Sequence, residues 1–334
     1  MTPISRTRRF LSVQSHVVSG YCGNKSATFP LQVLGFEVDV INTVQLSNHT
    51  QYKLTRGHIF KSQDLDELHF GLKSNDLLQL YDHILSGYVA DVSYIKSLAA
   101  LIKDTKLERK NHRLDCWYTL DPVLGDDGVG YYVPKGVEIG KVYKEYLIPL
   151  ADIITPNKFE ASILSGVEID SSSDKVLDQA VEAMKCFHKM GVQIVIITSM
   201  EAVTDPGKLV CVLSHDPKAK SRSAEGAEGD QTWIEQPSVW TIKVPKLNCP
   251  FTGTGDLFTA LLSGWLQKTE FDLEKSFENT ANSIHEILED TLEWFKLENN
   301  GSVQSHELRL VQNLANITSP KQIRFKCHQV DVRT

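Results

Sequence analysis

The chain has 334 residues and a formal net charge of −7, with 41% hydrophobic and 23% charged residues, which is the balance of an ordinary globular protein. A chain of this length buries enough surface to fold without disulfides or a structural metal. The acidic balance argues against a nucleic-acid-binding protein, because such a protein needs a basic surface for the phosphates.

Cysteine spacing and hydropathy indicate the cellular compartment in which the protein is expected. No two of the six cysteines lie within three residues of each other, so there is neither a CxxC motif nor zinc spacing. Such scattered cysteines are typical of reduced thiols. The segment after the first arginines is polar where a signal peptide needs an apolar run, and apolar stretches such as residues 192–197 are too short to cross a bilayer. We expect a cytoplasmic protein with no membrane and no nucleic-acid partner.

Strand and helix patterns alternate through the first two thirds of the chain. Runs rich in β-branched and aromatic residues predict strands at residues 10–14, 38–42, within 81–88, and at 117–120, 153–154 and 193–198. Helical patterns predict a helix that follows a small-residue segment from Tyr21 and ends near residues 34–35, and further helices from 92, over 141–150, from 157 and over 174–190. This alternation predicts an α/β fold, with a mainly parallel central sheet flanked by helices on both faces.

The pattern changes after residue 200. Residues 208–214 and 233–244 resemble the two strands of an antiparallel pair, which predicts a small antiparallel flap. The stretch 218–231 between them has almost no apolar residues and predicts a mobile surface loop. Helical patterns return from Gly255 and over residues 273–297. We expect one domain over residues 1–334, with loose tails at 1–9 and about 328–334.

Two familiar phosphate-binding loops are absent from the sequence. Residues 20–26 end in Lys-Ser like a P-loop, but Ser19 and Asn24 stand where that motif requires glycines. A dinucleotide-binding motif also fails, because Phe258 occupies the position of its third glycine. Both results weaken the interpretations of a Walker-type nucleotidase and of a dehydrogenase.

The segment 253–256 carries a more specific signal. Gly253, Thr254 and Gly255 directly precede an apolar helical run, so their backbone N–H groups can bind an anion at the start of a helix. Asp256 in the first helical turn could be no more than a cap or a partner of the helix dipole. For an isolated motif that simpler interpretation is the favoured one.

Further polar residues follow the predicted strands. They are, in chain order, Asp121, Thr155, Asn157, Glu160, Thr198 and Ser199. In an open parallel sheet, ligands bind at the carboxyl ends of the strands, so we expect these side chains along one edge. Asn157 and Glu160 also fit a helix capping box, which structure alone could explain. Capping does not explain why Asp121, Glu160 and Asp256 should all end sheet elements.

In these segments the chain resembles the pyridoxal kinases, a family of the ribokinase-like superfamily. The matching blocks run from residue 14 to 311 and include residues 20–35, Ser-Asn-His-Thr at 47–50, Gly-Tyr at 87–88, Asp-Pro-Val-Leu-Gly-Asp at 121–126, residues 151–160, Gly-Thr-Gly-Asp at 253–256 and Glu-Leu-Arg at 307–309. The early blocks and residues 47–50 are more specific to the vitamin B6 branch than the Gly-Thr-Gly-Asp block. The Gly-Thr-Gly-Asp type is shared across the superfamily.

The resemblance implies a ribokinase-like fold and transfer of the γ-phosphoryl group of ATP to the 5′-hydroxymethyl group of pyridoxal, pyridoxine or pyridoxamine. It implies that Asp256 is the general base and that residues 253–255 form the anion hole. Positioning and charge neutralisation are what phosphoryl transfer mainly needs. The family also implies Mg²⁺ or another divalent cation, K⁺ or Na⁺, and a homodimer.

The resemblance also implies roles for the remaining residues. The expected substrate-binding residues are Ser15, Thr50, Tyr88 and Asp256. Ser15 and Thr50 would hydrogen-bond the polar atoms of the pyridine ring, with Tyr88 packing nearby and Asp256 at the hydroxyl group. The expected ATP-binding residues are Asp121, Tyr132, Asn157, Glu160, Thr198, Ser199, Leu247, Phe251, Thr252, Gly253, Thr254 and Gly255. The expected cation site comprises Asp121, Thr155, Glu160 and Thr198.

Two alternatives remain open. One is another kinase of the superfamily, acting on a hydroxymethylpyrimidine or a sugar. The other is a catalytically weak relative that binds B6 vitamers. The loop at residues 126–134 is shorter than the family's usual loop, and loop closure can govern nucleotide affinity or turnover. This departure keeps the second alternative open.

Overall fold

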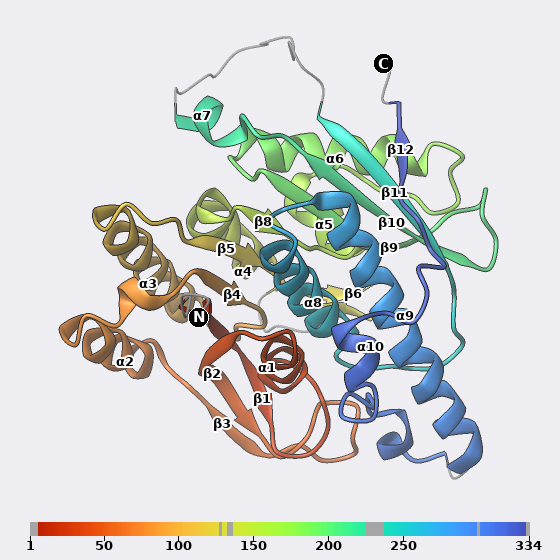
Figure 1. Ribbon diagram of the computed structural model, residues 1–334, viewed down its shortest axis with the longest axis horizontal. Coiled ribbons are helices and arrows are strands. Elements are labelled where there is room, and N and C mark those ends of the chain that lie inside the picture. Colours follow the sequence, from red (N-terminus) through yellow and green to blue (C-terminus); the bar gives the residue numbers. More distant parts are fainter. Residues whose placement is uncertain (1–5, 127–128, 132–135, 225–236, 299–300, 332–334) are drawn as a thin grey trace, which may run out of the picture.

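The computed structural model describes residues 6–126, 129–131, 136–224, 237–298 and 301–331, without the side chains of 222–224 (Figure 1). Within these residues, ten strands form one sheet in the order β12-β11-β10-β9-β8-β5-β4-β1-β2-β3. The strands are β1 (Arg9–Val17), β2 (Glu37–Leu46), β3 (Gly57–Ile59), β4 (His83–Ser86), β5 (Trp117–Leu120), β8 (Ile153–Ile154), β9 (Ile194–Glu201), β10 (Lys208–His215), β11 (Ser238–Pro245) and β12 (His328–Val330).

The centre of this sheet is parallel and its borders are antiparallel. Strands β2, β1, β4, β5, β8 and β9 run parallel to their neighbours, whereas β3 at one border and β10, β11 and β12 at the other are antiparallel. The mainly parallel sheet predicted from the sequence is confirmed. The carboxyl ends of β1, β4, β5 and β8 therefore meet at one edge, where ligands of such sheets bind.

Helices cover both faces of the sheet (Figure 1). On one face α1 (Asn24–Val33) and α9 (Leu273–Glu298) both pack against α8 (Thr254–Lys268). The helices of the other face are α2 (Ser62–Ser74), α3 (Val92–Asn111), α4 (Gly136–Val142), α5 (Lys158–Ser165) and α6 (Val176–Lys189). Two short helices, α7 (Ala219–Ala224) and α10 (Leu314–Thr318), complete the set within the described residues.

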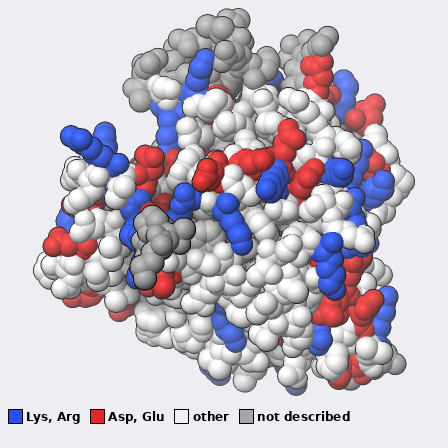
Figure 2. All heavy atoms as spheres, viewed as in Figure 1, with Lys and Arg blue, Asp and Glu red and all other residues white. Residues whose placement is uncertain are grey.

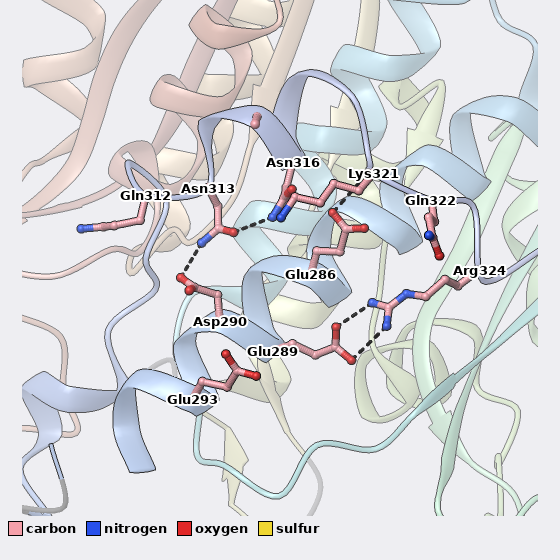
Figure 3. A pocket seen from close by; sticks show the side chains of 11 residues that line it. Glu286, Glu289, Asp290, Glu293, Gln312, Asn313, Asn316, Lys321, Gln322 and Arg324 are labelled. Atoms are coloured by element: carbon pink, nitrogen blue, oxygen red, sulfur yellow. Dashed lines mark hydrogen bonds and ion pairs between the residues drawn. The ribbon is translucent and has the colours of Figure 1, made fainter. Parts of the chain in front are cut away.

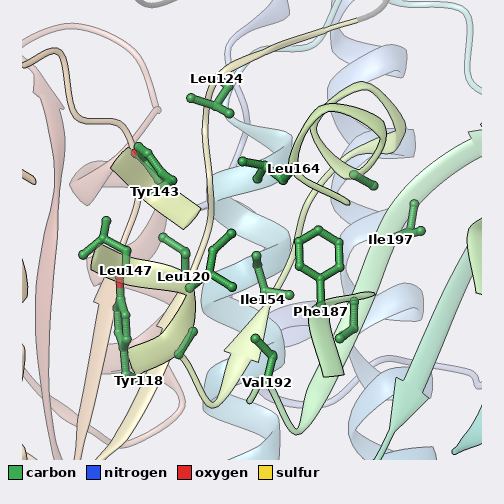
Figure 4. Packing of buried hydrophobic residues seen from close by; sticks show 14 of the residues in the cluster. Tyr118, Leu120, Leu124, Tyr143, Leu147, Ile154, Leu164, Phe187, Val192 and Ile197 are labelled. Carbon is green, nitrogen blue, oxygen red and sulfur yellow. The ribbon is translucent and has the colours of Figure 1, made fainter. Parts of the chain in front are cut away.

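Alternate residues of the central strands pack against opposite helix layers. Leu120, Ile154 and Ile197 lie in the cluster formed with α3 and α6 (Figure 4), whereas Ile153 and Ile196 pack against α8 and α9. Because both faces are buried, these strands are apolar at successive positions rather than alternating. This burial explains the continuous apolar runs in the sequence and holds the strand ends rigidly in place.

One predicted helix has a more varied form. The sequence predicts a helix over residues 141–150, but α4 begins at Gly136 and is followed by a π-helix over Tyr143–Leu147 and a 3₁₀ turn over Ile148–Leu150. Pro149 lies in that turn and has no N–H for a helical hydrogen bond, so an α-helix does not continue to residue 150.

The predicted antiparallel strands are present, but they extend the main sheet. Strands β10 and β11 pair antiparallel, and β10 also pairs with β9. A separate two-stranded antiparallel sheet consists of β6 (Gly125–Asp126) and β7 (Gly130–Tyr131). This small sheet overlaps the 126–134 segment, of which residues 127–128 and 132–134 are outside the described residues.

Three segments predicted to be loose or mobile are partly ordered. In the 218–231 segment, residues 219–224 form α7, where Ala219 is buried and Lys220 pairs with Asp152; residues 225–236 are not described. Near the amino terminus, Arg6 pairs with Asp82 at 2.6 Å. At the other terminus, β12 pairs with β11. These corrections share a cause: each segment is anchored by a few contacts, too few to create apolar periodicity.

Candidate active site

The carboxyl ends of β5 and β8 bring two predicted residues together. Asp121 follows β5 and Thr155 follows β8, and both are buried. Thr259 of α8 joins them: its Oγ1 donates to Asp121 Oδ2 at 3.3 Å and lies 2.9 Å from Thr155 Oγ1. The edge of the sheet and the first turns of α8 therefore form one polar centre.

Glu160 and Asn157 form the predicted capping box at the start of α5. Asn157 Oδ1 accepts from the backbone N–H of Glu160 at 2.9 Å, and Glu160 Oε2 accepts from the N–H of Asn157 at 2.9 Å. The other carboxylate oxygen, Oε1, accepts from the N–H of Leu124 at 2.9 Å, and Asn157 Nδ2 donates to the carbonyl of Gly125 at 2.8 Å. The pair thus fixes the segment that follows Asp121.

The start of α8 has the geometry expected of an anion site. Gly253 adopts a left-handed conformation (φ 77°), and no side chain caps the helix. A Cβ on Gly253 would stand 2.2 Å from the carbonyl oxygen of Tyr21, so the position needs glycine. A Cβ on Gly255 would approach only Asp121 Oδ2, at 3.8 Å. The first-turn N–H groups therefore remain available to a ligand.

Asp256 lies in the first turn of α8 and is held by the backbone. Its Oδ2 accepts from the N–H of Gly23 at 2.7 Å. Gly23 also has a positive φ (55°), and a Cβ there would collide with the backbone oxygen of Ser15 at 2.1 Å. The loop between β1 and α1 therefore connects Ser15 to Asp256.

Three carboxylates at this edge have raised pKa values. Burial raises the pKa of Asp121 well above its ordinary value, and the charges of Glu160 and Asp256 add to the effect. Burial also raises the pKa of Glu160 to about 8 and raises that of Asp256, although hydrogen bonds from backbone N–H groups oppose the shift in both. Among the described residues, no Lys or Arg pairs with any of the three. Clustered, uncompensated carboxylates are typical of a site that receives cations.

The predicted cation residues fit that chemistry only in part. Asp121 and Thr155 lie together through Thr259, and the N–H of Thr198 donates to the carbonyl of Pro156 beside Thr155. Glu160 already accepts backbone hydrogen bonds on both carboxylate oxygens. No group of three or more His, Cys, Asp and Glu side chains in the described part of the chain is arranged to hold a metal. Ligands from a bound phosphate and from water would have to complete the shell.

The expected vitamer residues lie on separate loops. Ser15 is half-buried near the end of β1, Thr50 is exposed after β2, and Tyr88 is half-buried after β4. The backbone oxygen of Tyr88 accepts from Thr43 Oγ1 at 2.7 Å. The backbone oxygen of Ser15 lies close to Gly23, 2.1 Å from where a Cβ would stand, and the N–H of Gly23 donates to Asp256.

The remaining expected ATP-binding residues come from two segments. Thr198 and Ser199 lie inside β9, which continues to Glu201 instead of ending at residue 198. Leu247, Phe251 and Thr252 lie between β11 and α8 and are half-buried. Within the described residues, the buried Thr252 Oγ1 has no hydrogen-bond partner, which suits a ligand oxygen. Tyr132 lies outside the described residues.

Sequence reasoning missed the polar face of α8. Thr259, Ser263 and Gln267 recur every four residues in an otherwise apolar helix and are buried against the sheet. Ser263 Oγ donates to Thr119 Oγ1 at 3.1 Å, and Gln267 Nε2 lies 3.1 Å from His83 Nδ1. Their four-residue spacing in the sequence was the available signal.

One described pocket lies away from this edge and has the wrong charge for ATP. It measures about 450 Å³ and is lined by residues of α9 and of the segment 312–324 (Figure 3). Four carboxylates, from Glu286, Glu289, Asp290 and Glu293, line it against two cations, Lys321 and Arg324, and Arg324 pairs with Glu289 at 2.6 Å. A triphosphate would be repelled there. On the face in Figure 2, basic and acidic side chains are interspersed and form no broad basic area. No helix in the described ranges has the length and apolar character to span a membrane.

The family model described as "Phosphomethylpyrimidine kinase" matches residues 87–303. The chain is 39% identical to the pyridoxal kinase of Bos taurus over 322 residues, which cover 94% of this chain and 96% of that one. It is 41% identical to the pyridoxal kinase of Arabidopsis thaliana, over 95% of this chain and 93% of the other. The structure of the Leishmania donovani pyridoxal kinase in complex with ADP and pyridoxamine superposes with a TM-score of 0.84 at 32% identity, over 97% of this chain and 100% of that one. The resemblance recognised in the sequence motifs is confirmed, and the chain belongs to the pyridoxal kinase family.

Proposed function

We propose that this chain transfers the γ-phosphoryl group of ATP to the 5′-hydroxymethyl group of pyridoxal and related B6 vitamers, with Asp256 as the general base. One observation carries the proposal. Asp256 is held by the N–H of Gly23 at 2.7 Å, in the first turn of a helix whose start has no side-chain cap. A base and an anion site are therefore adjacent, as phosphoryl transfer requires.

In the proposed reaction, Asp256 accepts the proton of the vitamer hydroxyl as its oxygen forms a bond to the γ-phosphorus. The bond between that phosphorus and the bridging oxygen of ADP breaks, and ADP leaves with the electron pair. The N–H groups of residues 253–255 stabilise the charge on the moving phosphoryl group. Burial raises the pKa of Asp256, which suits a group that must take up a proton.

The proposed cations would neutralise phosphate charge during the transfer. Asp121, Thr155 and Thr198 would hold K⁺ or Na⁺, with oxygen atoms as ligands. Glu160 would face Mg²⁺ through water, since both of its carboxylate oxygens are already bound to backbone N–H groups. This arrangement is supported by the raised pKa values of the uncompensated carboxylates.

Substrate contacts complete the proposal. Ser15, Thr50 and Tyr88 would contact the pyridine ring, with ATP on the side of residues 247–252 and of Asn157, Ser199 and Tyr132. The pyridoxal kinases of Leishmania donovani in complex with ADP and pyridoxamine or pyridoxine support these two ligand classes. We also propose a cytoplasmic location and a homodimer. Sedimentation of the full chain would test the dimer.

A second candidate substrate is a hydroxymethylpyrimidine. The matched family model carries the description of a phosphomethylpyrimidine kinase, and its match begins at residue 87, after Ser15 and Thr50. Steady-state ADP formation, measured with pyridoxal and with hydroxymethylpyrimidine at equal MgATP, with and without K⁺, separates the two. We expect turnover of pyridoxal. No preference for pyridoxal would overturn the first proposal, and no ATP consumption with any vitamer would indicate a binding protein.

A further inference from the structure

Glu307 is a buried carboxylate that joins three segments around the candidate site. It follows a 3₁₀ turn over Val303–His306, and its side chain is only 11% exposed. No Lys or Arg among the described residues pairs with it. Its partners come instead from the loop after β1 and from the loop after β2, which lie more than 250 residues earlier in the chain.

All of these partners are hydrogen-bond donors. Glu307 Oε2 accepts from the backbone N–H of Tyr21 at 2.9 Å, and Oε1 accepts from Tyr52 O–H at 3.1 Å. Oε1 also lies 3.0 Å from His49 Nε2. Because His49 Nδ1 accepts from the N–H of Gln51 at 3.4 Å, its Nε2 carries the proton and donates to Glu307.

The residues around Glu307 leave space for its carboxylate and favour its ionised form. Gly20 has a φ of 90°, and a Cβ there would stand 2.2 Å from Glu307 Oε1, so the carboxylate fills the space that a side chain would need. Burial alone raises the pKa of Glu307, but hydrogen bonds from His49, Tyr21 and Tyr52 outweigh it and hold the pKa below its ordinary value. The carboxylate therefore stays ionised where it is buried.

The loop held by Glu307 is the loop that holds Asp256. Glu307 binds the N–H of Tyr21 and Asp256 binds the N–H of Gly23, so two carboxylates fix positions two residues apart. Between these contacts, the carbonyl oxygen of Tyr21 lies against Gly253 at the start of α8. On the other side, His49 directly precedes Thr50, the expected vitamer contact. Glu307 thus links the vitamer loop to the anion site.

We propose that Glu307 is a positioning residue for the vitamer half of the site: it holds the loops of Tyr21 and His49 in the arrangement that binds the B6 ring beside Asp256. This inference rests on the proposed function. It differs from the role of Asp256, because Glu307 acts through other residues and touches neither phosphate nor the reacting hydroxyl. ATP-side residues make no described contact with Glu307.

The test is the steady-state kinetics of Glu307→Gln. An amide presents an NH₂ group to at least one of three donors, so it cannot replace the acceptor-only carboxylate. We expect KM for pyridoxal to rise about tenfold or more, since hydrogen bonds to charged groups contribute that much. We expect KM for ATP to stay unchanged. Equal KM values for pyridoxal in Glu307→Gln and the unaltered chain would overturn the inference.

A matched control separates positioning from folding. Glu289→Gln also removes a His–Glu contact, between His285 and Glu289 at 3.2 Å on α9, and should leave both KM values unchanged. If Glu307→Gln fails to fold, Tyr52→Phe keeps the carboxylate and removes one donor, and it should raise KM for pyridoxal by a smaller factor. A rise in the KM of ATP as large as that of pyridoxal would show a merely structural role.

The kinetics of Asp256→Asn distinguish this inference from the proposed function. That variant should lose kcat while pyridoxal still binds, whereas Glu307→Gln should lose pyridoxal affinity. Near-normal kcat in Asp256→Asn would overturn the base assignment alone. An unchanged KM for pyridoxal in Glu307→Gln would overturn the positioning role alone.

Discussion

The two edges of the central sheet treat buried charge in opposite ways. At the amino ends of the strands, Asp82 precedes β4 and pairs with Arg109 at 2.7 Å and with Arg6 at 2.6 Å. Asp152 precedes β8 and pairs with Lys106 at 2.6 Å and with Lys220 of α7. At the carboxyl ends, Asp121, Glu160 and Asp256 have no Lys or Arg partner among the described residues.

This difference separates stability from function. Paired charges at the amino ends tie helices α3 and α7 to the strands, so each buried carboxylate there is compensated within the fold. Carboxylates at the other edge carry a desolvation cost that the fold does not offset, as their raised pKa values show. Ligands and cations would offset it when they bind. Substitutions at the two edges should therefore affect different measurements.

The largest effect should come from Asp256→Asn. The amide keeps an oxygen for the N–H of Gly23 but cannot accept the substrate proton, so kcat should fall by about 10²–10⁴-fold. The midpoint of thermal unfolding should not fall, because an uncompensated buried charge is removed. Kinetics and calorimetry of the same preparation check both. The control Asp104→Asn changes a carboxylate that pairs with Lys73 on the surface, and kcat should stay unchanged.

Arg109→Met should have the opposite effect to Asp256→Asn: it should lower stability and leave kcat unchanged. Arg109 is 3% exposed and binds Asp82, the carbonyl of Gln79 at 3.0 Å and the carbonyl of Asp115. Breaking a buried pair of this kind costs about 3–5 kcal/mol of unfolding free energy, whereas kcat of the folded fraction should stay unchanged. Urea titration measures the loss.

A surface pair provides the control for Arg109. Arg324 pairs with Glu289 at 2.6 Å, but both side chains are more than a third exposed. Arg324→Met should therefore cost no more than about 1 kcal/mol. Equal losses in the two arginine variants would contradict the view that the amino edge is a buried anchor.

These contrasts also show what the sequence could predict. Asp121, Thr155 and residues 253–256 were predictable because each follows a strongly apolar strand or directly precedes an apolar helical run, and sheet topology brings such positions to one edge. Helix α7 was not, because one buried alanine and one ion pair leave no periodic signal. The glycine-based motif also predicted the start of α8 at Gly253, where the left-handed backbone explains the residue type.

Long-range polar contacts could not be predicted from the sequence, for another reason. Glu307 belongs to a matching block, but its partners Tyr21 and His49 are fixed by tertiary packing and by no local pattern. Thr259 has the same difficulty: its hydroxyl joins residues that follow two different strands. Only the folded arrangement of α8 against β5 and β8 makes these contacts.

His83 should make stability at the amino edge depend on pH. Burial lowers its pKa from 6.5 to about 3, with a smaller effect of the charge of Lys106. The ring is therefore neutral in the fold, whereas the unfolded chain takes up a proton below pH 6.5. Unfolding free energy should fall as the pH drops from 6.5 toward 3, by about 1.4 kcal/mol per pH unit from this group.

The difference between variants isolates that contribution. His83→Gln should show a shallower decrease in unfolding free energy between pH 6.5 and 4.5 than the unaltered chain, measured by urea titration at each pH. His58→Gln replaces an exposed histidine and should leave the slope unchanged. Parallel curves for His83→Gln and the unaltered chain would rule out a neutral, buried ring.

Substitutions of the two glycines at the start of α8 should differ in their effect on stability, and Gly255→Ala should have the smallest such effect of all these variants. Gly255→Ala adds a methyl group that meets only Asp121 Oδ2, at 3.8 Å, so unfolding free energy should change by no more than about 1 kcal/mol and can rise, because alanine favours the helix. The same methyl group stands between Asp121 and an incoming phosphate, so kcat should fall. Gly253→Ala must instead accept a φ of 77° and a 2.2 Å contact with the Tyr21 carbonyl oxygen, and it should lose stability as well as activity. If Gly255→Ala kept full activity, the open space at the carboxyl edge would not be the phosphate position.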